Sequence, residues 1–299
     1  FISTFQDDFN PSILDNWIAA DTSVSPGKSM QVVLGYEEYI KNMYKIQVEG
    51  YYKDLKNLLT YEEKRSTSDA PVSDESLANI VTPADGYAYG FELFGQKMSG
   101  KLSGWVAYTY SVSRKIMNSI YADGEQEYYT NWDRTHAFSV LGNYQFNTKW
   151  ETNWRFALQS GQAYTPIMGY YVQKFPESPE ELFRTIPGTR NSGRYEPYSR
   201  LDIGAVYHAK IGKTNVDFFF QIINTLNRSN TFTKIYSLGS PYNGLDDDGD
   251  WDKDLHDTNG NGRADPGETN VDESDEGKIH ERSIGLFPIL PTFGFTWEF

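Results

Sequence analysis

Large apolar side chains alternate with small or polar ones at the end of this chain. In GLFPILPTFGFTWEF, the odd positions Phe293, Phe295, Trp297 and Phe299 are aromatic, whereas the even positions between them are small or polar. A period of two places the two sets on opposite faces of a β-strand. The pattern therefore predicts a strand with one apolar face and one polar face.

The same alternation recurs in eight further segments. They are MQVVLGYEEYI from Met30, MYKIQVEGYY from Met43, DGYAYGFEL from Asp85, KLSGWVAYTYSV from Lys101, HAFSVLGNYQF from His136, WETNWRFALQ from Trp150, LDIGAVYH from Leu201 and VDFFFQII from Val216. Together the segments predict nine strands of about 10 to 14 residues, whereas strands of soluble domains usually have roughly 5 or 6. The predicted polar face includes Lys45, Glu49, Glu92, Asn143, Glu151, Arg155 and Asp202.

The connections between these segments alternate in length. Short turns that carry lysine, at 41–42, 98–100, 148–149 and 212–213 or directly beside them, alternate with long polar stretches at 62–84, 117–132, 160–197 and 229–284. Bacterial outer-membrane barrels have short periplasmic turns and long extracellular loops. Alternating strands alone favour a soluble sandwich, but strand length, loop alternation and aromatic residues near both strand ends together predict an antiparallel transmembrane β-barrel with long extracellular loops.

Composition excludes several other classes. No apolar run approaches the roughly 18 residues of a membrane helix. The absence of cysteine excludes disulfides and cysteine-based sites. Residues 246–276 hold thirteen acidic and two basic residues, so this stretch carries −11 of the net charge of −14. A protein that binds nucleic acid needs a basic face, and this charge distribution argues against one.

Nine strands is an odd number, and a bacterial single-chain barrel needs an even one. If the last strand runs toward the periplasm, the first predicted strand does too, and residues 1–29 belong to an outer loop. We therefore expect at least one further strand upstream. Residues 1–299 are interpreted as the C-terminal part of a larger barrel domain.

Eight stretches in order resemble the C-terminal half of TonB-dependent outer-membrane receptors, especially the type found in Bacteroidota-like bacteria. They are SVSPGKSMQVVLGYEEYI, YKIQVEGYYKDLKNLL, GYAYGFELFGQKMSGKLSGWVAYTYSVSRK, NWDRTHAFSVLGNYQF, ALQSGQAYTP, YSRLDIGAVY, QIINTLNRSN and PTFGFTWEF. The resemblance extends from about Ser23 to Phe299, apart from an acidic insert.

This resemblance implies a bacterial outer-membrane protein that takes up a scarce nutrient, such as an iron chelate, vitamin, glycan or peptide. It implies a barrel of roughly 22 strands in contact with outer-membrane lipid, an N-terminal plug, and a TonB-type energy-coupling protein that acts through the plug. It leaves open whether a surface lipoprotein caps the pore. The terminal Phe293, Phe295, Trp297 and Phe299 resemble the signal that the outer-membrane assembly machinery reads.

The acidic insert at 243–276 contains DTNGNGRADPGE, which fits the EF-hand loop pattern. Such a loop wraps six to eight oxygens around a calcium ion. The predicted ligands are Asp257, Asn259, Asn261, the backbone carbonyl of Arg263, Asp265 and Glu268. We expect a structural Ca²⁺ site in an extracellular loop, because the sequence shows no flanking helices of a sensor.

A second, degenerate calcium site is possible just before this loop. DDDGDWDKD places Asp246, Asp248, Asp250 and Asp252 at alternate positions, but it has no glutamate at position twelve. The alternative for both stretches is a solvated acidic loop without an ion.

The long stretch 160–197 contains the remaining candidates. Tyr164, Tyr170 and Tyr171 could stack on a ligand, although packing between loops is the more ordinary role. ESPEELFR predicts the start of a short helix with Ser178 as N-cap. No GxSxG, HExxH, Walker or GxGxxG motif occurs, so we do not expect an enzyme. The alternatives to a receptor are a passive porin-like channel and a barrel-anchored, calcium-stabilised surface binding protein.

Overall fold

The computed structural model describes residues 2–5, 16–19, 25–61, 81–118, 124–174, 181–212, 214–238, 260 and 279–298. Every regular element in these residues is a β-strand. No helix in this part of the chain is long and apolar enough to cross a membrane. All strand pairs with a recorded register are antiparallel. The expected all-β, antiparallel architecture is therefore confirmed for the described residues.

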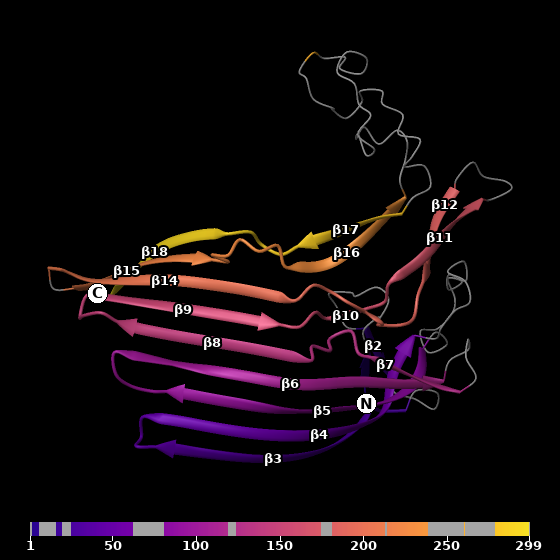
Figure 1. Cartoon of the computed structure of the whole chain (residues 1–299), viewed down its shortest axis with the longest axis horizontal. Helices are drawn as coiled ribbons and strands as arrows, with labels where there is room; N and C mark the ends of the chain where they lie inside the picture. The colour runs from indigo at the N-terminus through magenta and orange to yellow at the C-terminus, as the bar shows by residue number, and fades with distance from the viewer. Residues whose placement is uncertain are drawn as a thin grey trace. The chain divides into compact units, whose positions relative to one another are not determined.

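One sheet dominates the fold (Figure 1). Its continuous path runs through β3 (Lys28–Ile40), β4 (Tyr44–Tyr61), β5 (Val81–Lys97), β6 (Leu102–Asn118), β8 (His136–Gln145), β9 (Trp150–Gln159), β14 (Tyr198–Ile211), β15 (Thr214–Ile223) and β18 (Leu290–Glu298). These are the nine strands that the alternation predicts. A short tenth strand, β7 (Glu125–Tyr129), pairs with the far part of β6. Among the described residues β3 and β18 do not pair with each other, so the sheet is open at both edges.

Four two-stranded antiparallel sheets complete the described strands. They are β1 (Ile2–Phe5) with β2 (Asn16–Ala19), β10 (Ala163–Tyr164) with β13 (Gly193–Arg194), β11 (Ile167–Lys174) with β12 (Glu181–Pro187), and β16 (Thr231–Leu238) with β17 (Ile279–Gly285). The chain divides into two compact units, of which one holds the large sheet. The other comprises residues 167–186 and 231–285, and so holds most of the β11–β12 hairpin and all of β16–β17.

The strand connections of the sheet alternate in length as expected. Tight turns join β3 to β4, β5 to β6, β8 to β9 and β14 to β15, and Figure 1 shows them together at one end of the strands. In the first turn Lys41 and Asn42 both have positive φ (51° and 52°), and the Met43 N–H donates to the Ile40 carbonyl at 3.0 Å. Two positive φ values in succession define the type I′ turn that matches the twist of a hairpin. We call this the turn end, and the opposite one the loop end.

Three strands are longer than the sequence predicts. β4 has 18 residues, and β5 and β6 have 17 each. A membrane strand needs only ~9–11 residues. The extra length lies at the loop end, where the pairing of β4 with β5 shifts register between Leu55 and Leu58 and β6 continues against β7. The alternation did not predict this extra length, because polar residues that are common in turns interrupt the apolar–polar pattern at the loop end.

The predicted helix start at ESPEELFR is wrong for the residues that can be described. Glu181 to Arg184 belong to β12, which pairs with β11. Residues 175–180, including Ser178, lie outside the described residues. An N-cap pattern is a local signal of about 1 kcal/mol, and pairing along a neighbouring strand overrides it here.

Few large apolar side chains are buried. The buried hydrophobic residues in the described part are Leu59, Ala84, Val112, Met117, Tyr128, Ala157, Ala163 and Val216. The largest fully buried side chains are instead the polar Asn191, Asn224, Thr60 and Thr130. A small cluster of Ala84, Met117 and Tyr128 sits at the loop end. Among the described residues, the sheet therefore lacks the apolar core that a soluble sandwich forms between its layers.

Candidate functional site: a sheet with one apolar and one polar face

The register of the sheet collects the alternating apolar residues of all nine strands on one face. Two rows of successive Cα partners show this. The first is Tyr36, Val48, Leu93, Tyr108, Phe138 and Leu158, from β3 to β9. The second is Trp150, Tyr207, Phe218 and Phe295, from β9 to β18. We call this side the apolar face and the other side the polar face.

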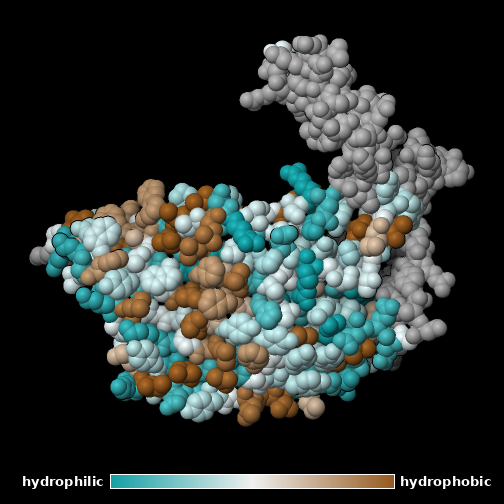
Figure 2. Space-filling model, viewed as in Figure 1, coloured by the Kyte–Doolittle hydropathy of each residue, from teal (hydrophilic) through white to brown (hydrophobic). Residues whose placement is uncertain are grey.

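The apolar face is exposed. Leu34 is 82% exposed on the edge strand, and Leu93 in the interior of the sheet is 42% exposed. Phe218 is 44% and Phe295 63% exposed, while Tyr108 is half-buried. Figure 2 shows hydrophobic side chains gathered in a band that crosses the strands. Soluble monomers rarely expose an apolar patch of more than a few hundred Å², so a face this wide indicates a non-aqueous neighbour.

Aromatic residues mark two levels along the strands of this face. At the turn end lie Tyr44, Trp150 and Trp297. At the second level Tyr52, Tyr89 and Tyr110 are each eight residues from the turn end of β4, β5 and β6. Eight residues span about 26 Å of strand at ~3.3 Å per residue. That length is of the order of the apolar band of membrane barrels, ~25 Å tall between aromatic girdles.

Rings of neighbouring strands contact one another along the apolar face. The Trp150 and Tyr207 centroids are 4.7 Å apart, and those of Phe91 and Tyr110 are 5.6 Å apart. Such cross-strand pairs contribute roughly 0.2–1 kcal/mol each. They stabilise the register between strands without a covering layer.

The polar face carries the residues that the sequence analysis assigned to it. Pairing places Glu49 opposite Glu92, Asn143 opposite Asn153, and Arg155 opposite Asp202. Lys45 and Glu151 share this side by the same alternation, so all seven predicted residues lie on one face.

Contacts between titratable side chains link strands across the polar face. His208 on β14 lies between two carboxylates, with Nδ1 2.8 Å from Asp217 Oδ1 on β15 and Nε2 3.9 Å from Glu151 Oε2 on β9. Lys45 Nζ on β4 is 2.8 Å from Glu37 Oε2 on β3. The two faces therefore differ in kind: one offers hydrocarbon and aromatic surface, and the other offers paired charges and amides.

At the loop end, the Asp133 carboxylate accepts a hydrogen bond from a backbone N–H of β6 that has no partner on a neighbouring described strand. β6 pairs with β8 up to Tyr110 and with β7 from Arg114, which leaves Ser111 to Ser113 between partners. The Ser113 N–H donates to Asp133 Oδ2 at 2.7 Å, and the Ser111 N–H donates to the Thr135 carbonyl at 3.0 Å. The NWDRTH stretch thus supplies the acceptors that neither strand provides.

The same carboxylate anchors the segment before β14. Arg194 Nη2 donates to Asp133 Oδ1 at 2.6 Å, and the Asp133 side chain is only 1% exposed. The Tyr129 ring contacts two guanidinium groups, with its centroid 4.3 Å from the Cζ atom of Arg194 and 3.4 Å from that of Arg114. Arg134 is half-buried, and this burial lowers the pKa of its guanidinium.

Arg190 ties a second part of this connection to the polar-face side of the sheet. Its Nη1 donates to Thr60 Oγ1 at 2.7 Å and to the Tyr128 hydroxyl at 3.3 Å, and its guanidinium lies 5.1 Å from the Tyr128 ring. Arg190 is 5% exposed. Sequence reasoning missed Asp133 and Arg190 as organising residues, because their partners are up to 130 positions away.

The terminal aromatic residues lie where the alternation predicts. Phe293, Phe295 and Trp297 project from the apolar face of β18, opposite Phe220, Phe218 and Val216 of β15. Phe299 lies outside the described residues. The role of these residues as an assembly signal stays a prediction.

The predicted ligand-stacking tyrosines fall in two elements. Tyr164 on β10 stacks on Tyr195 with centroids 4.5 Å apart and planes 12° apart. This contact is the loop packing that we gave as the ordinary role. Tyr170 and Tyr171 belong to β11 in the other unit, and both are half-buried. Their binding of a ligand stays a prediction.

Both predicted calcium stretches lie outside the described residues. This applies to Asp257, Asn259, Asn261, Arg263, Asp265 and Glu268, and to Asp246, Asp248, Asp250 and Asp252. In the part of the chain that the structure does describe, no three His, Asp or Glu side chains converge as metal ligands would.

The chain was compared with protein families, curated proteins and solved structures. The chain matched no protein family and no curated protein. Among solved structures, the FrpB iron transporter from Neisseria meningitidis (F3-3 variant) is similar over 71% of this chain, with 16% sequence identity and a TM-score of 0.44. The matched region is 28% of that transporter, so this chain spans only part of its length. A likeness at this level establishes neither a family nor a function.

Proposed function

We propose that this chain is the C-terminal wall of an outer-membrane β-barrel that takes up a scarce nutrient by TonB-dependent transport. One observation carries the proposal: nine antiparallel strands form a sheet whose exposed apolar face is continuous and whose opposite face is polar. In a barrel wall the first face contacts lipid and the second lines the lumen. The tight turns then lie on the periplasmic side, and the long connections on the outer side.

The open edges of the sheet fit a fragment of a larger barrel. Unpaired edges do not occur in the hydrocarbon region of a membrane, because each unsatisfied backbone group costs several kcal/mol there. β3 and β18 each lack a second neighbour among the described strands. We infer that further strands of the complete protein pair with these two edges and close the barrel.

The distinction between active and passive transport can be tested on the full-length protein. A receptor with a plug should give no steady conductance in a planar bilayer, and uptake of its nutrient by intact cells should stop when a protonophore collapses the proton gradient. We expect both results, with ⁵⁵Fe-labelled ferric chelates, labelled cobalamin, oligosaccharides and peptides as the panel of probes. Steady conductance together with uptake that persists would instead identify a passive porin-like channel.

We also propose, on the loop spacing alone, that residues 257–268 bind a structural Ca²⁺ ion. Calcium titration of the full-length protein should protect this segment from proteolysis, and the double substitution Asp257→Ala and Glu268→Ala should abolish the protection. Equal protease sensitivity with and without calcium would contradict the proposal. If deletion of 246–276 abolished binding to a surface partner while the barrel still assembled, the chain would be a surface binding protein.

A further inference from the structure

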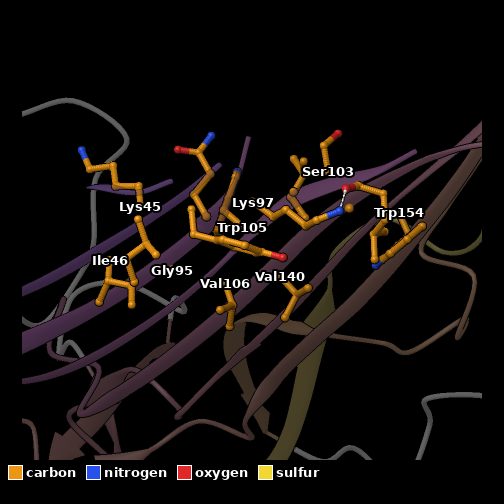
Figure 3. A pocket seen from close by; sticks show the side chains of 16 residues that line it. Lys45, Ile46, Gly95, Lys97, Ser103, Trp105, Val106, Val140 and Trp154 are labelled. Atoms are coloured by element: carbon orange, nitrogen blue, oxygen red, sulfur yellow. Dashed lines mark hydrogen bonds between the residues drawn. The ribbon is translucent and has the colours of Figure 1, made fainter. Parts of the chain in front are cut away.

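A groove of about 410 Å³ lies near the turn end of β4, β5, β6, β8 and β9. Its apolar-face lining includes Tyr44, Ile46, Leu102, Val106, Val140 and Trp154. Figure 3 shows the side chains of Ile46, Val106 and Val140 on one side of the strands, and those of Lys45 and Ser103 on the other. The volume falls within the ~300–1,000 Å³ usual for small-molecule sites.

The groove exists because three apolar-face positions are glycine. Gly95 lies between Ile46 and Val106 in one row of partners, and Gly104 lies opposite Gly142 in the next. A Cβ at Gly142 would lie 2.2 Å from Trp154 Cζ2, so the indole covers bare backbone there. The other rows of described partners on this face carry mostly large side chains, with Gly50 as a single glycine. The groove therefore results from these three glycines, which the pairing of the strands brings into adjacent rows.

Lysine residues lie at the turn end of the groove, and one acidic residue, Glu38, lies opposite Ile46 on its β3 side. Lys97 lines the groove, and its ammonium donates one hydrogen bond to the Leu102 carbonyl at 2.7 Å. An ammonium has three donors, so Lys97 can still bind an anion. Turn residues 41–43, 98–101 and 146–149 include Lys41, Lys101 and Lys149 but no acidic residue. Basic residues beside a membrane are attracted to anionic headgroups.

We propose that this groove binds one acyl chain of an anionic membrane glycerophospholipid, with its phosphate against Lys97 and Lys101. The inference rests on the proposed function, because it requires the apolar face to lie in a bilayer. Tyr44 and Trp154, which line the groove, are residue types that favour the interface, where headgroups meet hydrocarbon. The groove thus continues the lipid-facing band and adds a charge that selects the lipid.

Photo-crosslinking of the full-length protein in bilayers tests this assignment. The probes are phosphatidylglycerol and phosphatidylcholine, each with a diazirine on one acyl chain. The filling variant is Gly95→Leu, since a Cβ at Gly95 would meet only Val106 Cγ1 at an ordinary 3.5 Å. Its matched control is Gly50→Leu, on the same face but away from the groove, where a Cβ would meet only the Gly90 carbonyl at 3.9 Å. Gly95→Ala is the milder variant should Gly95→Leu fail to assemble.

We expect crosslinks to concentrate on the β5, β6 and β8 peptides that line the groove. Gly95→Leu should reduce this labelling about tenfold, which corresponds to ~1.4 kcal/mol, and Gly50→Leu should leave it unchanged. Lys97→Gln with Lys101→Gln should remove the preference for phosphatidylglycerol. Even labelling along the apolar face would overturn the groove site while leaving the proposed function intact, and equal labelling by both lipids would overturn the anionic headgroup. Absence of labelling at Phe218 and Phe295 as well would contradict the proposed function itself.

Discussion

The two faces of the sheet are built from the same strands, yet they suit different solvents. Phe218 and Phe219 are neighbours in β15 and are almost equally exposed, at 44% and 41%. Phe218 lies on the apolar face among Tyr207 and Phe295, whereas Phe219 lies on the polar face over Gly294. The exposed fraction of a side chain therefore does not tell whether it faces lipid or water. The chemical character of the neighbouring side chains on the same face does.

The largest expected effect comes from placing a charge at these two positions. In bilayers, Phe218→Arg should lower the free energy of unfolding by about 2–4 kcal/mol, the cost of a cation on the lipid face of a barrel near the midplane. Phe219→Arg should cost about 1 kcal/mol or less, as is usual for substitutions at solvated sites. Urea titration of the full-length protein in lipid vesicles measures both. Equal losses of unfolding free energy in the two variants would mean that both faces contact the same medium, which would contradict a wall between lipid and water.

The second prediction concerns the buried carboxylate that organises the loop end. Asp133→Ala leaves the Ser113 N–H without its acceptor and Arg194 without its counterion. Breaking a fully buried pair costs ~3–5 kcal/mol, but the Arg194 side chain is 30% exposed, so we expect about 1–3 kcal/mol. Hydrogen exchange should show faster exchange at 111–113 and 190–194, with the turn end unchanged as the internal control. Unchanged exchange at Ser113 would contradict this role.

A third, smaller effect should have the opposite sign. Glu92 lies directly opposite Glu49 on the polar face, and like charges at this distance are unfavourable, whereas opposite charges contribute roughly 0.2–1 kcal/mol. Glu92→Lys should therefore stabilise the protein slightly in the vesicle assay. Leu93→Lys, one residue along and on the apolar face, is the matched control and should cost about 2–4 kcal/mol. A clear loss of stability in Glu92→Lys would contradict the assignment of the polar face to a water-filled lumen.

The smallest effect concerns the β16–β17 hairpin, which belongs to neither face of the sheet. Lys234 Nζ lies 2.5 Å from Glu281 Oε1, and the hydrogen bond from Lys234 lowers the pKa of the Glu281 carboxyl below its ordinary 4.5. A lowered pKa stabilises the hairpin at pH values above 4.5, and this contribution disappears as the pH falls through the native pKa. Protection factors of the hairpin amides, which are exchange rates corrected for the intrinsic pH dependence, should fall as the pH drops below 4.5 in the native protein, and Glu281→Gln should show no such step.

The strands and their two faces could be predicted from the sequence, because the alternation that defines them is a local property of each strand. The Phe293, Phe295 and Trp297 series gives a strand and its two faces without knowledge of any partner. The polar face could be predicted for the same reason. β12 shows where local reading fails: its residues carry a capping pattern, but pairing with β11 decides their conformation.

Features that depend on register could not be predicted from the sequence. Nothing near Asp133 indicates that its carboxylate completes the ladder of β6, and nothing near Arg190 indicates contact with Thr60. The groove needs Gly104 and Gly142 to fall opposite each other on neighbouring strands. Each glycine alone reads as an ordinary weak point in a strand.

Nitroxide scanning of β15 tests the central claim most directly, because residues 1–299 contain no cysteine that would compete with a single-site label, and any cysteine elsewhere in the full-length protein can be replaced by serine. Labels at each position from 216 to 223, in the full-length protein in bilayers, are measured for collisions with oxygen and with a water-soluble nickel complex. We predict a period of two, with oxygen favoured at Val216, Phe218, Phe220 and Ile222 and nickel favoured at the alternate positions 217, 219, 221 and 223. The same preference at all eight positions, or one with no period of two, would contradict a wall between lipid and water.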